Sequence, residues 1–365
     1  MTGIRIQGVG TALPEHVCDQ AYVRRVVENL FGERVENLER LLKVFDHLHI
    51  EKRYFARDPE WYRKDRGFGE ANDLFIETAL KLSAKAAQEA IAIADAAPED
   101  FAGIVVASTT GVMTPSLEAH LVQDLGLPLH SVRLPLFGLG CAGGVAGLAR
   151  AAELSSGRDG APVLFVAVEI CSATFQRNDL SKSNLIGTSI FGDGAAAVVV
   201  GRAESGPEIL GSYHRLFPET YDIMGWDVID SGMKVRFSRD IPNFVRTHLP
   251  MVLEEACSAW GITQDDIVSS SPTPAAPKCL TPLRKSFAGT DVRLLPHMRF
   301  SDATAICLPL LYSSYSSICW LTESWNMGTD LCRRSVPDSA PINFSCITND
   351  NSHSPSDHSH RPAVD

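Results

Sequence analysis

The sequence predicts an α/β fold in which helices cover both faces of a layered sheet. Between residues 80 and 200, short apolar stretches typical of buried strands alternate with stretches of helical apolar spacing. The chain has 365 residues, of which 45% are hydrophobic. That is enough to bury a large core, as one large or two medium domains.

Local periodicity, turn residues and capping residues place the individual elements. Predicted strands cover residues 4–9, 104–107, 132–137, 163–168 and 191–198. Helical spacing covers residues 21–45, 73–95, 116–125, 145–154 and 241–260. Thr114-Pro115-Ser116 is expected to cap the third of these helices, and Asp240 with Pro242 in the first turn begins the last. The loop Ser108–Gly111 follows a strand, which is a usual place for sites in open α/β sheets.

The charge balance excludes several classes of partner. A formal net charge of −11 and an isoelectric point near 5.5 argue against nucleic acid or an anionic membrane as the main partner. The first residues lack a basic region followed by an apolar run, and no apolar stretch is long enough to span a bilayer. We therefore expect a soluble, cytoplasmic protein with reduced thiols.

The segment around Cys141 is the strongest candidate for chemistry. A strand-like run enters the glycine-dense turn 138–144, and a helix-forming run leaves it. A thiol at such a junction points at a helix N-terminus, where unpaired N–H groups favour the thiolate. An isolated cysteine is more often simply buried in a tight turn. The surrounding glycines, which leave room for a ligand near the sulfur, favour the nucleophile instead.

The segment GLGCAGGVAGLARAAEL resembles the nucleophile segment of the type III polyketide synthases, the chalcone synthase-like enzymes of the thiolase superfamily. Among them, the bacterial branch with alkylresorcinol and alkylpyrone synthases is the most similar. The resemblance extends without a large gap over residues 1 to about 265. It implies a thiolase-like layered α-β-α fold.

The resemblance also implies a substrate site. The segment FGDGAAA matches a family strand whose phenylalanine, here Phe191, gates the acyl tunnel. Phe191 could equally be a core aromatic residue, and both roles are compatible. Thr110 and Thr174 are expected to contact substrate. Val235 stands where the family often has an aromatic residue, which predicts a roomier pocket.

The stretch from Arg40 to Tyr54, which ends in DHLHIEKRY, resembles the family region that contacts the phosphates of coenzyme A. Its basic residues Arg40, Lys43 and His47 fall where the family places such contacts. The alternative, a solvated helix face, has equal weight on the sequence alone.

The resemblance breaks near residue 268. The family histidine lies in an HPGGP motif and the family asparagine in a YGNMS motif, and neither motif is present. Composition changes at the same place: five of the nine cysteines but only two of the 27 glycines follow residue 270. No CxxC or HxxxH spacing accompanies these cysteines, so we expect no metal site.

Our hypothesis for this break is a frameshift near residues 266–270, from a real mutation, a sequencing error or a wrong intron boundary. When suitable codons for residues 273–281 are read one base earlier, they spell His-Pro-Gly-Gly-Pro-Lys-Val-Leu-Asp. Residues 300–311, read at the same offset, give Leu-Arg-Arg-Tyr-Gly-Asn-Met-Ser-Ala-Ala-Thr-Val. The histidine codon would lie across Pro272 and Thr273, and the asparagine codon across Ala305 and Ile306.

This predicts three regions: an N-terminal thiolase-like half at 1–205, the start of the C-terminal half at 206–268, and an aberrant, poorly ordered tail at 269–365. The second thiolase-like half would be incomplete after about residue 268.

The resemblance implies a decarboxylative Claisen condensation. Cys141 would take an acyl group from acyl-CoA, and the family's histidine and asparagine would stabilise the enolate formed when malonyl-CoA loses CO2. The product would cyclise to a resorcinol, phloroglucinol or pyrone. No cofactor is expected, because both CoA thioesters are substrates, and the family assembles as homodimers. Without the two motifs, the chain is expected to be nearly inactive.

Two other readings stay open on the sequence alone. One is a 3-ketoacyl-ACP synthase III-like condensing enzyme, and the other is a non-catalytic relic or partner subunit.

Overall fold

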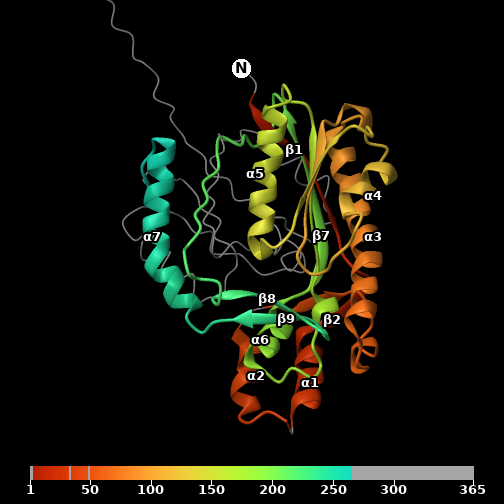
Figure 1. The fold of residues 1–365 in the computed structure, drawn as a ribbon, viewed down its shortest axis with the longest axis vertical. Coiled ribbons are helices and arrows are strands. Elements are labelled where there is room, and N and C mark those ends of the chain that lie inside the picture. Colours follow the sequence, from red (N-terminus) through yellow and green to blue (C-terminus); the bar gives the residue numbers. More distant parts are fainter. Residues whose placement is uncertain (1–2, 33, 48–49, 265–365) are drawn as a thin grey trace, which may run out of the picture.

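The computed structural model describes residues 3–32, 34–47 and 50–264. The predicted aberrant tail, 269–365, and the residues just before it lie outside the described part. A five-stranded mixed sheet lies at its centre (Figure 1). In order across the sheet, the strands are β1 (Ile4–Ala12), β7 (Asp193–Arg202), β6 (Val163–Ile170), β4 (Gly103–Ala107) and β5 (Val132–Leu136). Helix α5 (Gly143–Ser156) covers one face, and α3 (Phe68–Ala94) and α4 (Leu117–Asp124) cover the other. The predicted α/β fold is confirmed.

The side chains of β6 show why this sheet is buried on both faces. Leu164, Val166 and Val168 belong to the core cluster beneath α3, whereas Val163 and Phe165 belong to the cluster that includes residues of α5. Successive side chains of a strand point to opposite faces, so an uninterrupted apolar run fits a strand with a helix layer on each side.

Smaller elements gather at one end of the sheet (Figure 1). Three helices pack together there: α1 (Gln20–Phe31), α2 (Leu38–His47) and α6 (Lys182–Ile190). Two antiparallel pairs accompany them, β2 (His16–Asp19) with β3 (Lys52–Phe55), and β8 (Met224–Ile229) with β9 (Gly232–Phe237). Helix α7 (Ile241–Trp260) follows the second pair. The 21–45 helical stretch therefore forms two helices rather than one.

The sheet topology collects several strand ends at one edge. Strands β4, β5 and β6 are parallel, so their carboxyl ends lie together, and the antiparallel β7 begins at that edge. Ligands of open α/β sheets bind outside such carboxyl ends. The predicted loop Ser108–Gly111 and the Cys141 turn both follow strands that end here.

Two expected caps differ from the structure. Asp240 and Ser116 occupy the N-cap positions of α7 and α4, but neither side chain accepts a hydrogen bond from the helix backbone. The Ser116 hydroxyl instead donates to Glu118, and Asp240 has helical backbone angles. Helix α3 begins at Phe68 rather than at residue 73. Residues 69–73 are a glycine, an alanine and three polar residues, so the apolar period is hidden there.

Gly10 marks a close contact between β1 and α3, and its replacement is the first testable prediction. A Cβ at Gly10 would lie 2.1 Å from the Ala86 carbonyl oxygen of α3. Gly10→Ala is therefore expected to lower the free energy of unfolding by about 1–3 kcal/mol, measured by urea denaturation. Gly69→Ala is the matched control, since nothing lies within 4 Å of a Cβ there. An unchanged midpoint for Gly10→Ala would contradict this packing.

Candidate active site

Cys141 lies in the short 3-10 turn Gly140–Ala142, directly before α5. The turn needs glycine: Gly138 and Gly140 have φ angles of 82° and 52°, in the left-handed region. Cys141 is half-buried, and its neighbour Leu139 is 44% exposed. The predicted strand–turn–helix around the cysteine is confirmed.

Glu169, at the end of β6, ties this turn to the loop after β4. Its carboxylate accepts hydrogen bonds from the backbone N–H groups of Thr109 and Thr110, both at 3.0 Å, and from the Thr110 hydroxyl at 2.6 Å. Thr109 Oγ1 in turn accepts from the Gly140 N–H at 3.1 Å. The residue before Cys141 is thus linked to Glu169 through Thr109.

The electrostatics of Cys141 correct one expectation. Burial raises the pKa of the Cys141 thiol well above its usual value, and the negative charge of Glu169 raises it further. The backbone N–H of Cys141 itself acts in the opposite direction but does not compensate. The helix N-terminus alone does not hold Cys141 as a thiolate, contrary to the sequence-based argument, so the thiol needs a base or a cation from elsewhere.

Thr110 is placed beside Glu169, whereas Thr174 and Phe191 lie in a separate group. Thr174 and Phe191 line a mostly apolar cavity that is partly open to solvent. Helices α1 and α6, strand β3 and the β8–β9 hairpin form most of its walls. Two short 3-10 helices, Trp61–Arg63 and Cys171–Thr174, complete them. Cys171, one residue after β6 ends, also lines the cavity. Only Ile170 separates Cys171 from Glu169 along the chain, so the two groups adjoin at the sheet edge.

Helix α1 supplies an apolar wall that the sequence did not reveal as a site. Val23 and Val27 are buried in the core, while Val26 and Leu30 are only partly buried, and all four line the cavity. The apolar spacing of residues 21–45 predicted a helix but assigned its apolar stripe no role. Its width is the signal that could have been used, because it extends past the face that the core covers.

Hydrogen bonds fix the backbone just before Phe191, and an aromatic contact fixes its ring. At the C-terminus of α6, the buried Arg53 donates to the Thr188 carbonyl at 3.0 Å, and Gln20 donates to the Ser189 carbonyl at 2.8 Å. A cation and an amide donor there satisfy carbonyls that the helix leaves unpaired. The Phe191 ring packs against Trp226. The placement is compatible with a gate, and Val235 also lines the cavity, as expected for a roomier pocket.

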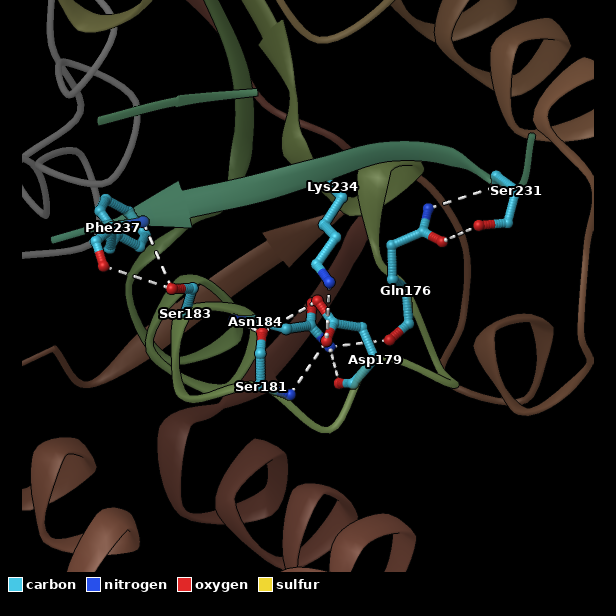
Figure 2. A network of polar contacts seen from close by, with 8 residues as sticks. All are labelled: Gln176, Asp179, Ser181, Ser183, Asn184, Ser231, Lys234 and Phe237. Atoms are coloured by element: carbon cyan, nitrogen blue, oxygen red, sulfur yellow. Dashed lines mark hydrogen bonds and ion pairs between the residues drawn. The ribbon is translucent and has the colours of Figure 1, made fainter. Parts of the chain in front are cut away.

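Polar contacts fasten the β8–β9 hairpin to the segment before α6 (Figure 2). The Ser231 hydroxyl donates to Gln176 Oε1 at 2.8 Å, and Lys234 Nζ lies 3.6 Å from Asp179 Oδ1. At the other end of the hairpin, the Phe237 N–H donates to Ser183 Oγ at 3.3 Å. The hairpin wall of the cavity is thereby fixed on α6.

Asn184 is the centre of this network, and it carries a second prediction. It is 4% exposed, and its amide donates to the carbonyls of Gln176 and Asp179 at 2.7 and 2.8 Å. Asn184→Ala removes both of these hydrogen bonds from a buried side chain, so we expect a loss of about 1–3 kcal/mol in the free energy of unfolding, measured by urea denaturation. Asn178→Ala, which removes an exposed amide bonded to Asp65, should cost less than about 0.5 kcal/mol. Equal losses would argue against this role of Asn184.

The basic residues expected to contact coenzyme A lie on α2, away from the Cys141 turn. Arg40 and Lys43 are exposed, and the His47 side chain lies outside the described part of the chain. The structure therefore leaves the solvated-face alternative open. The positions where the histidine and asparagine motifs were sought, residues 271–311, also lie outside the described residues.

Within the described residues, no helix is long and apolar enough to cross a membrane. No group of three or more potential metal ligands occurs among the residues described either. The four cysteines placed in this part of the chain, Cys18, Cys141, Cys171 and Cys257, are free thiols.

Comparison with known proteins agrees with this geometry. Residues 3–204 match the family described as chalcone and stilbene synthases, N-terminal domain. A Bacillus subtilis protein provisionally named a chalcone synthase is 39% identical over 258 residues, covering 67% of this chain and 71% of that protein. A 1,3,6,8-tetrahydroxynaphthalene synthase from Streptomyces peucetius is 34% identical over 284 residues, covering 76% and 75%. The crystal structure of the corresponding Streptomyces coelicolor enzyme, a bacterial type III polyketide synthase, superposes with a TM-score of 0.77 at 23% identity, over 89% of this chain and all of that one.

The layered sheet, the glycine turn with its cysteine and these matches define a thiolase-like type III polyketide synthase, an enzyme of the acyltransferase class. The chain belongs to the chalcone and stilbene synthase family. This supports the polyketide synthase reading over the ketoacyl-ACP synthase alternative.

Proposed function

We propose that this chain takes an acyl group from an acyl-CoA starter onto Cys141, with the acyl chain in the apolar cavity beside Phe191. The observation that supports this most is the position of the cavity next to the sheet edge that carries Cys141 and Glu169. A cavity lined by valine, leucine and phenylalanine side chains suits an aliphatic chain.

In the complete reaction, the loaded acyl group would be extended by malonyl-CoA and cyclised to a resorcinol, phloroglucinol or pyrone. No bound cofactor is required, because the CoA thioesters are themselves the substrates. Arg40, Lys43 and His47 would face the CoA phosphates, and Thr110, Thr174 and Phe191 the acyl chain. The relatives include a phloroglucinol synthase from Pseudomonas fluorescens and a 3,5-dihydroxyphenylacetyl-CoA synthase from Streptomyces toyocaensis.

The raised pKa of the Cys141 thiol favours a second candidate function, in which the chain binds acyl-CoA but does not catalyse acyl transfer. Loading separates the two candidates. The chain is incubated with dodecanoyl-CoA near pH 9 and analysed by intact mass, with Cys141→Ala as the control. A thioester on Cys141 supports the enzyme; binding of dodecanoyl-CoA without any loading supports the second candidate.

We propose a homodimer in the cytoplasm, in keeping with the family resemblance and with the free thiol of Cys141. Light scattering coupled to gel filtration tests the dimer, and a single monomer mass would contradict it. We also propose the division into an N-terminal half (1–205), the start of a second half (206–268) and an aberrant tail (269–365), which limited proteolysis would test.

A further inference from the structure

Strand β3 and the residue after it anchor the chain on both sides of Phe191. Before Phe191, Arg53 Nη1 donates to the Thr188 carbonyl at 3.0 Å. After it, the Asp193 carboxyl accepts from the Ala56 N–H at 2.7 Å. Arg53 belongs to β3 and Ala56 directly follows that strand. Arg53 and Asp193 are each 1% exposed, so the short segment that carries Phe191 is fixed to one strand at two buried points.

Gln20, the first residue of α1, completes the anchor before Phe191. It is 5% exposed, its side-chain amide donates to the Ser189 carbonyl at 2.8 Å, and its Oε1 accepts from Arg53 Nη1 at 3.3 Å. An α-helix leaves its last carbonyls without partners, and the Thr188 and Ser189 carbonyls lie in the last turn of α6. Arg53 satisfies one of them directly, and by binding Gln20 Oε1 it turns the amide donor toward the other.

The Phe191 ring has aromatic neighbours on both strands of the β8–β9 hairpin. Its centroid lies 6.1 Å from that of Trp226 and 5.7 Å from that of Phe237. On the α6 side, a Cβ at Gly187 would lie 3.6 Å from the ring. Phe191, Trp226 and Gly187 all line the cavity. An acyl chain in this cavity would therefore meet a ring whose position the surrounding protein sets.

We propose that Arg53 and Gln20 are positioning residues that hold the Phe191 ring in the place where it contacts an acyl chain. Gln20 is not among the described residues that line the cavity, so it can act on the chain only through its neighbours. A side chain that is already ordered adds its contacts without the entropic cost of being immobilised on binding. The inference rests on the proposed function, since it requires the acyl chain to occupy this cavity.

The test measures binding to the full chain, so it does not depend on catalysis. 1-Dodecanol displaces the neutral fluorescent probe N-phenyl-1-naphthylamine, and neither compound offers a charge to Arg53. Gln20→Ala removes the donor to the Ser189 carbonyl and should weaken dodecanol binding about three- to tenfold, because binding must then order the Phe191 ring. Arg53→Met removes both contacts of the guanidinium and should weaken it at least as much.

A double substitution separates positioning from general destabilisation. In a Phe191→Ala chain no ring is left to position, so adding Gln20→Ala should change the dodecanol affinity by less than about twofold. Gly10→Ala is the control, because it is expected to destabilise the fold at a residue that is not among the described lining residues. It should leave the dodecanol affinity within about twofold of the original.

The outcomes distinguish the inference from the proposed function. If dodecanol does not bind the unmodified chain, the proposed use of the cavity is wrong and the inference is overturned with it. If dodecanol binds, an equal loss for Gln20→Ala with and without the Phe191 ring, or no loss in either, overturns only the positioning role. Gln20→Ala decides the result if Arg53→Met fails to fold, since it leaves the guanidinium and its contact with Thr188 in place.

Discussion

A chain whose codons beyond residue 268 are read in the shifted frame will decarboxylate malonyl-CoA at least about a thousandfold faster than the present chain. On the frameshift hypothesis, the shifted frame would restore a histidine in HPGGP and an asparagine in GNMS. Loss of a single donor to a developing oxyanion already costs roughly a hundred- to a thousandfold. The present sequence contains neither motif.

The structure explains why Cys141 depends on such partners. Its thiol pKa is raised by burial and by Glu169, and among the described groups only the Cys141 N–H acts against them. A cationic histidine near the sulfur would favour the thiolate, as it does in other cysteine enzymes. Among the described residues, the surroundings of Cys141 therefore raise the pKa of its thiol and do not favour the thiolate.

The experiment begins with the nucleotide sequence over codons 260–315. If the second frame spells both motifs, the restored and the present chains are compared by release of labelled CO2 from malonyl-CoA, with Cys141→Ala in the restored chain as the background. Comparable rates for the two chains would refute the prediction. If the second frame does not spell the motifs, the frameshift hypothesis is wrong and the partners of Cys141 must lie elsewhere.

Local sequence was sufficient to predict most helices and strands and the turn that carries Cys141. It was not sufficient to predict which residues line the cavity. The period of β6 and the glycines around Cys141 are local signals, and both led to the observed structure. Tyr62 and Asp193 are far apart in the sequence, and they meet through Ser172 only because β6, β7 and the Trp61–Arg63 turn end at one place. The periodicity of apolar residues cannot predict contacts between residues so far apart in the sequence.

Glu169 shows the same limit in electrostatic terms. From the sequence it was only the polar residue at the end of a predicted strand. Its chemical character comes from its partly buried position and from the donors of Thr109 and Thr110, which reach it across the sheet edge. The pKa of a carboxyl group depends on such tertiary surroundings and not on its neighbours along the chain.

Replacing Glu169 by glutamine will change how stability depends on pH. Burial raises the pKa of Glu169 to about 7, although the hydrogen bonds from Thr110 and Thr109 lower it, against an ordinary value of 4.5. Between these values the folded state binds more protons than the unfolded state, so the free energy of unfolding falls as the pH rises. The contribution of Glu169 is fully present below about pH 4.5 and is lost as the pH passes about 7.

Glutamine mimics the neutral acid and does not titrate. Relative to the unmodified chain, Glu169→Gln should therefore be more stable at pH 8 than at pH 5, by about 2–3 kcal/mol, measured by urea denaturation at both values. The exposed Glu60→Gln is the control and should change by less than about 0.5 kcal/mol. A pH-independent effect of Glu169→Gln would mean that the carboxyl is already ionised at pH 5 in the folded chain.

The same substitution links Glu169 to Cys141. Removing the negative charge lowers the pKa of the Cys141 thiol, since Glu169 is the second cause of its elevation after burial. More thiolate is then present at pH 8, and alkylation of Cys141 by iodoacetamide, followed by peptide mass analysis, should become several-fold faster. Burial still opposes ionisation, so Cys141 should stay slower than a free thiol. Faster alkylation together with the pH-dependent stability change would show that one buried charge governs both groups, whereas a stability change alone would show that Glu169 lies too far from the sulfur to control it.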